Sequence, residues 1–417
     1  MNAAEILKIE RFLLSKHLEA ARAEFEQLMQ KCADDVPIAD KLGNKLTHRE
    51  RTQMQVRSVF GTLRLNVVSG YSERMGKSLT PAREVLFGGE RSAMTPLLKL
   101  NATHLGLEAG SFEKAARLCA DWGVCISDDK LMDTVRSVGR QCLEERLPAR
   151  CAGAAGPEDV LFIMADGWNA RHRGPEWGRK NAPPDERVEW KDIKSAILFK
   201  QSHVVGGGNK RHALLTRHVV AVPADAGPER FGEAVERAAV RMGLNEAGKV
   251  YFFSDGGAYL WNMYEYRFEA VAKGTLDYYH AMEHLGVVAA ELIPDKAERD
   301  AWLEAARKQI KEEGGSKLSG TLSEMLKTRE LAKEKRKVAE REINYFDKHK
   351  RHMEYGKLRM DGIPIGSGAV ESLCGQFQNR LKRRGQFWSR NGFELILRAY
   401  VWYMNEELGY AIAPPAA

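Results

Sequence analysis

Two short, largely apolar runs, each followed by an Asp-Gly pair, limit the folds that this chain can adopt. Asp166 follows residues 160–165, and Asp255 follows residues 250–254. Continuous apolar runs of this length are typical of strands that are buried on both faces of a sheet. An Asp-Gly pair is typical of the turn that follows such a strand. The pattern therefore predicts an α/β sheet with an aspartate at the end of two strands.

A third acidic residue, Glu371, stands in a different context. It follows a glycine-rich turn at residues 365–369 and falls in the first turn of a predicted helix that begins near Ser367. A carboxylate in a first turn also suits the helix dipole, and an Asp-Gly pair is most often only a turn. None of the three acids therefore assigns a function alone. Their order and the Lys/Arg-rich segment after Glu371 favour a shared role.

The three carboxylates together suit the cleavage of phosphodiester bonds. Two divalent ions about 3.5–4 Å apart stabilise both the attacking and the leaving oxygen. Mg²⁺ is a hard ion that binds oxygen ligands and keeps several of its waters, so a few carboxylates are enough. We predict that Asp166 bridges two ions and that Asp255 and Glu371 each hold one. The predicted cofactor is Mg²⁺, for which Mn²⁺ would substitute.

The composition constrains the class of protein less than these motifs do. The 417 residues carry a net charge of +7, a mild excess that permits nucleic acid as a partner without requiring it. The six cysteines form no CxxC pair and no group with histidine at zinc-ligand spacing, which favours reduced thiols in a cytoplasmic protein. No apolar run approaches the roughly 20 residues that a membrane helix needs, so no membrane partner is expected.

The N-terminal region, residues 1–150, is predicted to be mainly helical. A helix is expected over residues 2–32, and a small β-hairpin is expected to turn near Gly61. Residues 107–147 predict two helices joined by a short glycine turn. This pattern fits a DNA-reading helix-turn-helix and equally any helical hairpin.

The rest of the chain alternates strand and helix before and after a purely helical stretch. Strand signals lie near residues 158–166, 187–200, 212–222, 248–254 and 269–277, with a helix near 229–242. The glycine-rich stretch at residues 206–210 joins two strands and is interpreted as a hairpin. The predicted fold is an α/β, RNase H-like mixed sheet with flanking helices. It spans residues 151–277 and 361–410 and is interrupted by an all-α insertion at residues 278–360.

Three stretches resemble bacterial insertion-sequence transposases of the DDE type, in particular the IS-Kra-type group. They are Ala165-Asp166-Gly167-Trp168, then Ser254-Asp255-Gly256-Gly257 with residues 276–285, and finally residues 362–372 with residues 380–389. The third stretch is the longest and most specific, and the resemblance covers roughly residues 100–410. Residues 1–100 match less distinctly.

The resemblance implies Mg²⁺-dependent cleavage at transposon ends and joining of the freed 3′-hydroxyl to target DNA. In placement, Asp166, Asp255 and Glu371 are similar to the catalytic triad of the family. Asp277 and His280 resemble a supporting D-x-x-H element, which we interpret as bracing the last strand rather than acting directly. Relatives of this kind can carry a Cys-rich knuckle, but the corresponding residues 70–77 have no cysteine, so no zinc is predicted.

A group of basic and aromatic residues near the acidic motifs is predicted to hold DNA. Basic side chains would contact phosphates, and tryptophans would stack on an unpaired end base. The alternatives are a solvated basic face and tryptophans that belong to the core. The predicted DNA-binding residues are Arg171, Arg173, Gln378, Arg380, Lys382, Arg383, Arg384, Trp168 and Trp388.

The function expected from these residues is DNA transposition by an endonuclease that also joins strands. Its partners would be transposon ends and target DNA, and its location the cytoplasm, at the nucleoid when bound to DNA. Bringing two ends together requires a homodimer or a higher homo-oligomer. Two alternatives stay open: an RNase H-like nuclease that cuts without joining, and an inactive, transposase-derived DNA-binding protein. The presence of all three acids argues against the inactive form.

Overall fold

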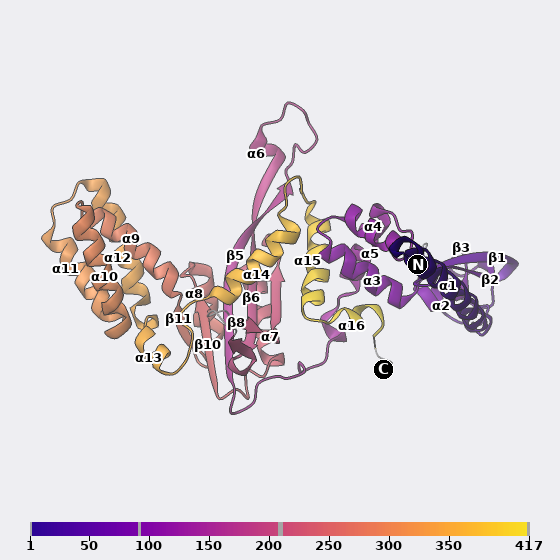
Figure 1. Ribbon diagram of the computed structural model, residues 1–417, viewed down its shortest axis with the longest axis horizontal. Coiled ribbons are helices and arrows are strands. Elements are labelled where there is room, and N and C mark those ends of the chain that lie inside the picture. The colour runs from indigo at the N-terminus through magenta and orange to yellow at the C-terminus, as the bar shows by residue number, and fades with distance from the viewer. Residues whose placement is uncertain (1, 91–92, 207–211, 415–417) are drawn as a thin grey trace. The chain divides into compact units, whose positions relative to one another are not determined.

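The computed structural model describes residues 2–90, 93–206 and 212–414 and divides the chain into two compact units (Figure 1). The N-terminal unit comprises Met1–Arg146 together with Glu407–Ala417, and the central unit comprises Leu147–Glu406. The protein is a mixed α/β protein. None of the helices in the described ranges is long and apolar enough to span a membrane.

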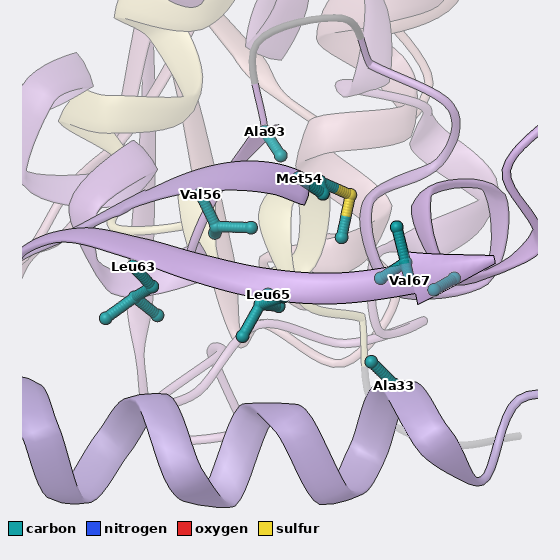
Figure 2. Close-up of a cluster of buried hydrophobic side chains, with 8 residues drawn as sticks. Ala33, Met54, Val56, Leu63, Leu65, Val67 and Ala93 are labelled. Carbon is teal, nitrogen blue, oxygen red and sulfur yellow. The ribbon is translucent and has the colours of Figure 1, made fainter. Parts of the chain in front are cut away.

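The N-terminal unit is built on a long hairpin that packs against the first helix. In the hairpin Ser58 is paired with Gly61, which confirms the predicted turn near Gly61. Alternate side chains of the hairpin are buried, and Figure 2 shows Leu63 and Leu65 pointing toward the helix. The four-stranded sheet has the order β3-β2-β1-β4. The elements are α1 (Ala3–Asp34), β1 (Thr47–Ser58), β2 (Gly61–Ser72), β3 (Lys77–Leu79), α2 (Pro81–Phe87) and β4 (Ala93–Met94).

A small helical group completes the N-terminal unit. It contains α3 (Pro96–Glu108), α4 (Phe112–Asp121), α5 (Asp128–Gln141) and α16 (Leu408–Ile412). The two helices predicted within residues 107–147 are confirmed as α4 and α5. Ser111 and Ser127 cap them by accepting hydrogen bonds from backbone N–H groups. The predicted boundary at residue 410 is wrong in one respect, because the chain from Glu407 onward packs with the N-terminal unit instead of the central sheet.

The central unit contains a five-stranded sheet in the order β11-β10-β5-β6-β9. Strand β6 lies between β5 and β9 and is antiparallel to both, and β10 and β11 run parallel to β5. The strands are β5 (Val160–Arg173), β6 (Val188–Lys200), β9 (His218–Val222), β10 (Lys249–Ser254) and β11 (Lys273–Leu276). The helices packed with them are α7 (Gly227–Arg241), α8 (Ala258–Arg267), α14 (Gly368–Leu381) and α15 (Arg390–Met404).

The predicted strands and the helix near 229–242 are all present, but the first strand does not end at Asp166. It continues to Arg173, paired with β6, and Asp166 lies opposite Ser195 inside the ladder. Figure 1 shows that β5 and β6 extend as a two-stranded ribbon beyond the other strands toward α6 (Pro184–Arg187). The prediction of a strand end at Asp166 was therefore wrong.

Gly167 has a different role from the turn that the sequence suggested. A β-carbon at this position would lie 2.7 Å from Oδ1 of Asp192 and 2.9 Å from the hydroxyl of Tyr259. Glycine inside a strand often marks such a close approach. The residue is required by the packing around the strand and not by a change in chain direction.

The predicted segment at residues 212–222 is divided into two strands, β8 (His212–Leu214) and β9. Strand β8 pairs with β7 (Val204–Gly206) in a separate antiparallel ribbon. This pairing agrees with the predicted hairpin, although residues 207–211 at its turn lie outside the described residues.

The predicted insertion at residues 278–360 contains helices and no strand. Lys, Glu and Ala dominate this stretch, and its apolar residues follow the helical period instead of alternating. Helix α12 packs against both α9 and α11. The insertion comprises α9 (Tyr278–Leu292), α10 (Lys296–Glu312), α11 (Gly315–Thr328), α12 (Lys333–His349) and α13 (Tyr355–Met360).

Candidate active site

The register of three parallel strands places three aspartates side by side. Phe253 of β10 lies opposite Met164 of β5, so Asp255, two residues after Phe253, is level with Asp166, two residues after Met164. Ser254 lies opposite Leu276 of β11, so Asp255 is also level with Asp277. Neighbouring strands are about 4.8 Å apart. The same edge of the sheet therefore carries a row of three carboxyl groups.

Helix α14 brings Glu371 to this row. The helix packs against β5 and β6, and Phe377 stacks on Trp168 of β5 with ring centroids 5.7 Å apart. One turn before Phe377, the Cys374 thiol donates to Oδ2 of Asp166 at 3.8 Å. Glu371 lies three residues before Cys374, on the neighbouring turn of the same face. Its side chain is exposed and accepts a hydrogen bond from the Ser367 hydroxyl at 3.3 Å.

Asp277 holds these elements together. Its side chain is fully buried, and each oxygen accepts two hydrogen bonds. Oδ1 accepts from the backbone N–H and the Nδ1 of His280, at 2.7 and 3.2 Å. Oδ2 accepts from the backbone N–H and the hydroxyl of Ser367, at 2.5 and 2.8 Å. Asp277 thus ties the end of β11 to the starts of α9 and α14, which supports the bracing role predicted for it.

The Asp277–His280 pair is charged at neutral pH. The hydrogen bond to Asp277 raises the pKa of His280 to about 9. Burial by itself would raise the pKa of Asp277, but the hydrogen bonds from His280 and Ser367 outweigh burial and hold this pKa below its ordinary value. The pair is therefore an ion pair of aspartate and imidazolium next to the exposed carboxylate of Glu371.

Asp166 is placed where a negative charge is disfavoured. Burial, with a smaller contribution from the neighbouring charges of Asp255 and Glu371, raises its pKa to about 6. The backbone N–H of Gly167, which donates to Oδ1 at 2.7 Å, and the positive charge of His280 act in the opposite direction. Repulsion between Asp166 and these two acids therefore adds to the cost of burying its charge. A bound cation would remove this repulsion.

The donor atoms indicate which residues can hold such a cation. Ligand atoms of Asp277, His280 and Glu371 all lie within 4.8 Å of one another. Asp277 and His280 are already engaged with other groups, because both oxygens of Asp277 accept hydrogen bonds and the contact with Asp277 raises the pKa of His280 to about 9. Asp166, Asp255 and Glu371 offer further carboxylate oxygens, although among the described residues the ligand atoms of these three do not all lie within 4.8 Å of one another. A site made only of carboxylates suits a hard ion such as Mg²⁺ or Mn²⁺.

The insertion contributes a residue that the sequence did not indicate. The hydroxyl of Tyr345, on α12, donates to the backbone carbonyl of Asp255 at 3.0 Å. The Tyr345 ring also stacks on His284, with centroids 3.9 Å apart. Gly256 makes this approach possible, since a β-carbon there would lie 2.6 Å from the ring. The glycine was visible in the sequence, but its partner is 89 positions away and shares no local pattern with it.

Three predicted DNA-binding residues are buried and cannot contact DNA at the surface. Trp168 is 3% exposed and donates its indole N–H to Ser195. Trp388 is 9% exposed and donates to the carbonyl of Leu381. Arg380 is 3% exposed. The prediction for these three was wrong because Trp168 on β5 and Arg380 on α14 are turned toward the core, and Trp388, in the loop after α14, packs its ring near Phe393 of α15.

Other predicted DNA-binding residues occupy the loop between α14 and α15 or support it. The guanidinium of Arg171 donates to the carbonyls of Lys382 and Arg383, and that of Arg173 donates to the carbonyl of Phe387. Both arginines thus fix the loop to β5. Lys382 and Gln378 are half-buried, whereas Arg383 and Arg384 are exposed.

The second half of the chain is similar to a known protein family. Residues 231–410 match an uncharacterised protein family (UPF0236). The matched segment begins in α7 and includes Asp255, Asp277, His280 and Glu371, but not Asp166. No curated protein matches the chain.

Proposed function

We propose that this chain is a metal-dependent DNA transposase of the DDE type. It would cut the 3′ ends of a mobile element and join the freed 3′-hydroxyl to target DNA. One observation carries the proposal: Asp166 is level with Asp255 on the neighbouring strand, contacts Cys374 of the helix that carries Glu371, and is a buried carboxyl group whose pKa is raised by burial and by the charges of these two acids.

The topology of the central unit supports the same proposal. Three antiparallel strands, a helix and two further parallel strands follow one another along the chain, with α14 packed over the first two strands. This is the element order expected of an RNase H-like core. The five helices at residues 278–360 separate Glu371 from the two aspartates, as expected of an all-α insertion in such a core.

The side chains of the site have distinct roles in this mechanism. When bound by Asp166, Asp255 and Glu371, divalent ions would supply positive charge to the attacking and leaving oxygens. The paired strands hold Asp166 and Asp255 in fixed positions, and the Asp277–Ser367 hydrogen bonds hold the helix that carries Glu371. In the first step water would attack the scissile phosphorus and displace the 3′-oxygen of the element's end, which leaves as a 3′-hydroxyl. In the second step this hydroxyl would attack a phosphorus of the target DNA and displace a 3′-oxygen of the target strand. Both steps are in-line displacements at one site.

The surface near the site supports DNA as the substrate. Residues 382–390 contain four basic residues, Lys382, Arg383, Arg384 and Arg390, and no acidic residue. Contacts between basic side chains and phosphates position DNA on a protein and supply much of the binding affinity. The loop begins directly after α14, the helix that carries Glu371.

Mapping the products made from the DNA that flanks the gene tests the proposal. The full chain is incubated with labelled flanking duplexes and Mg²⁺ or Mn²⁺, and every new 3′ end and every joined strand is sequenced. We expect discrete, metal-dependent nicks at two inverted ends, followed by joining to a second duplex. Nicks without joined products would favour the nuclease alternative. Binding without nicks would favour an inactive DNA-binding protein.

Mg²⁺ is expected to raise the melting temperature of the metal-free protein more at pH 7.5 than at pH 5.5. The folded-state pKa of Asp166, about 6, is above its ordinary value of 3.8. Ionising Asp166 therefore lowers stability as the pH rises through 6. A cation held by Asp166 would relieve this loss at pH 7.5, whereas protons compete with it at pH 5.5. Thermal melts at both pH values, with and without Mg²⁺, measure the effect, and an equal shift at both would argue against Asp166 as a ligand.

A further inference from the structure

Trp190 is an exposed aromatic residue between two cations. It lies on β6 opposite Arg171 of β5, and 57% of its surface is exposed. The guanidinium carbon of Arg171 lies 5.8 Å from the centroid of the indole, and the Nζ of Lys382 lies 5.3 Å from it. These cation–π contacts orient the ring without covering it. A large exposed indole in a fixed orientation is a feature of binding surfaces.

The surroundings of Trp190 are rigid and positively charged. The hydrogen bonds from Arg171 to the carbonyls of Lys382 and Arg383 attach the α14–α15 loop to the strand beside the indole. The side chains of Arg383 and Arg384 are exposed, and no ion pair is found for them in the part of the chain that the structure describes. Their charge is therefore available to a polyanion.

The position of Trp190 relates it to the acidic cluster. Its strand partner Arg171 is five residues beyond Asp166 on β5, a distance of about 17 Å at roughly 3.3 Å per residue. One strand of B-form DNA advances about 3.4 Å per nucleotide, so this distance corresponds to about five nucleotides. A nucleotide at Trp190 would therefore lie about five nucleotides from a scissile phosphate at Asp166.

We propose that Trp190 stacks on an unpaired base near the end of the DNA substrate, while Arg383 and Arg384 contact the adjacent phosphates. The proposal rests on the proposed function for the identity of the substrate. It differs from the stacking predicted for Trp168 and Trp388, which are buried. An exposed π-face flanked by cations suits any base, because every base offers a flat face and its backbone carries negative charge. In base-paired DNA this face is occupied by neighbouring bases.

Binding measurements without metal test this proposal separately from cleavage. Fluorescence anisotropy with the full chain in EDTA would compare two labelled duplexes, one blunt and one carrying a 3′ overhang of about five thymidines. We expect Trp190→Ala to weaken binding of the overhang duplex by about tenfold, within the range that stacking on one aromatic residue supplies. Binding of the blunt duplex should change by less than about twofold. Trp190→Phe should retain most of the affinity for the overhang duplex.

Tyr266→Ala is the matched control, because Tyr266 is an aromatic residue on α8 that is 79% exposed and also lies beside a cation, Arg267. It should leave both affinities unchanged. Unchanged overhang binding in Trp190→Ala, or equal losses on both duplexes, would overturn the proposal. A selective loss in a protein that never cleaves DNA would uphold the stacking site while contradicting the proposed function. Cleavage at inverted ends by the parent protein, with no selective loss of overhang binding in Trp190→Ala, would uphold the proposed function and contradict the stacking site.

Discussion

Replacing Asp166 with asparagine is expected to reduce metal-dependent DNA cleavage by at least about 10³-fold and to leave DNA binding within about twofold. Losing a single preorganised group that stabilises transition-state charge costs about 10²–10³-fold in rate. Replacing Asp166 should cost at least as much, because it is one of the three carboxylates proposed to hold the metal. The basic loop after α14 is untouched by this change, so the affinity for DNA should persist. Rates of nicking and anisotropy titrations on the same DNA measure the two effects.

The same substitution should not weaken the fold. Because the pKa of Asp166 is raised to about 6, its charge lowers stability at neutral pH, and removing the charge should increase the melting temperature at pH 7.5 in the absence of metal. This gain should disappear below about pH 4, where the carboxyl group is protonated in the folded and unfolded states alike. An inactive variant that melts at a higher temperature is the expected signature of a residue kept for function.

Asp225→Asn provides the control for Asp166→Asn. Asp225 has a side chain that is 54% exposed and pairs with Arg390 at 3.8 Å, so the same chemical change removes a surface charge. Its cleavage rate should match that of the parent protein. If Asp166→Asn cleaved DNA at the rate of the parent protein, the catalytic assignment would be contradicted. If both variants lost activity, cleavage would depend on the total negative charge of the protein and not on Asp166 in particular.

The strands of the central sheet were predictable because their sequence signal is local. Apolar runs before Asp166 and Asp255 are long enough to identify buried strands, and the register then brings the two acids level. The length of β5 was missed although its second half alternates in burial, with Trp168, Ala170 and His172 all buried. An Asp-Gly pair in the middle of this run was interpreted as a turn. Only the packing of Asp192 and Tyr259 around Gly167 explains the glycine.

The candidate site was less predictable than the sheet because its supporting contacts are long-range. Cys374 contacts Asp166 across 208 positions, and Tyr345 contacts Asp255 across 90. The spacing of apolar residues within one segment predicts its secondary structure but does not identify the residues that it contacts in another segment. The same reason explains why Trp168 was predicted to contact DNA. Its place in the core depends on the stacking of Phe377, a residue of a helix far along the chain.

Replacing Asp277 with alanine is expected to destabilise the central unit by about 3–5 kcal/mol. The change leaves the His280 imidazolium without its partner ion in a half-buried position and removes the acceptor for both donors of Ser367. Breaking a buried ion pair by removing one partner typically costs this amount. Urea unfolding followed by tryptophan fluorescence reports the central unit, since only Trp122 of the eight tryptophans lies outside it.

Asp295→Ala separates this effect from the loss of a helix cap. Asp295 caps α10 as Asp277 caps α9, by accepting a hydrogen bond from the backbone N–H three residues on, but it is exposed and makes no comparable set of contacts. Its loss should cost only about 1 kcal/mol. Equal effects of the two substitutions would show that Asp277 is no more than a cap.

The pH dependence of the Asp277→Ala effect identifies the ion pair. The pKa of His280 is raised to about 9 in the folded protein from an ordinary value of 6.5, so its contribution to stability is complete below pH 6.5 and is lost as the pH rises through 9. The pKa of Asp277 is lowered, so its contribution is present above its ordinary value of 3.8 and is lost at lower pH. The difference between parent and variant should therefore be largest between about pH 4 and 6.5 and should shrink toward pH 9. A difference that stays constant across this range would assign the whole effect to neutral hydrogen bonds and packing.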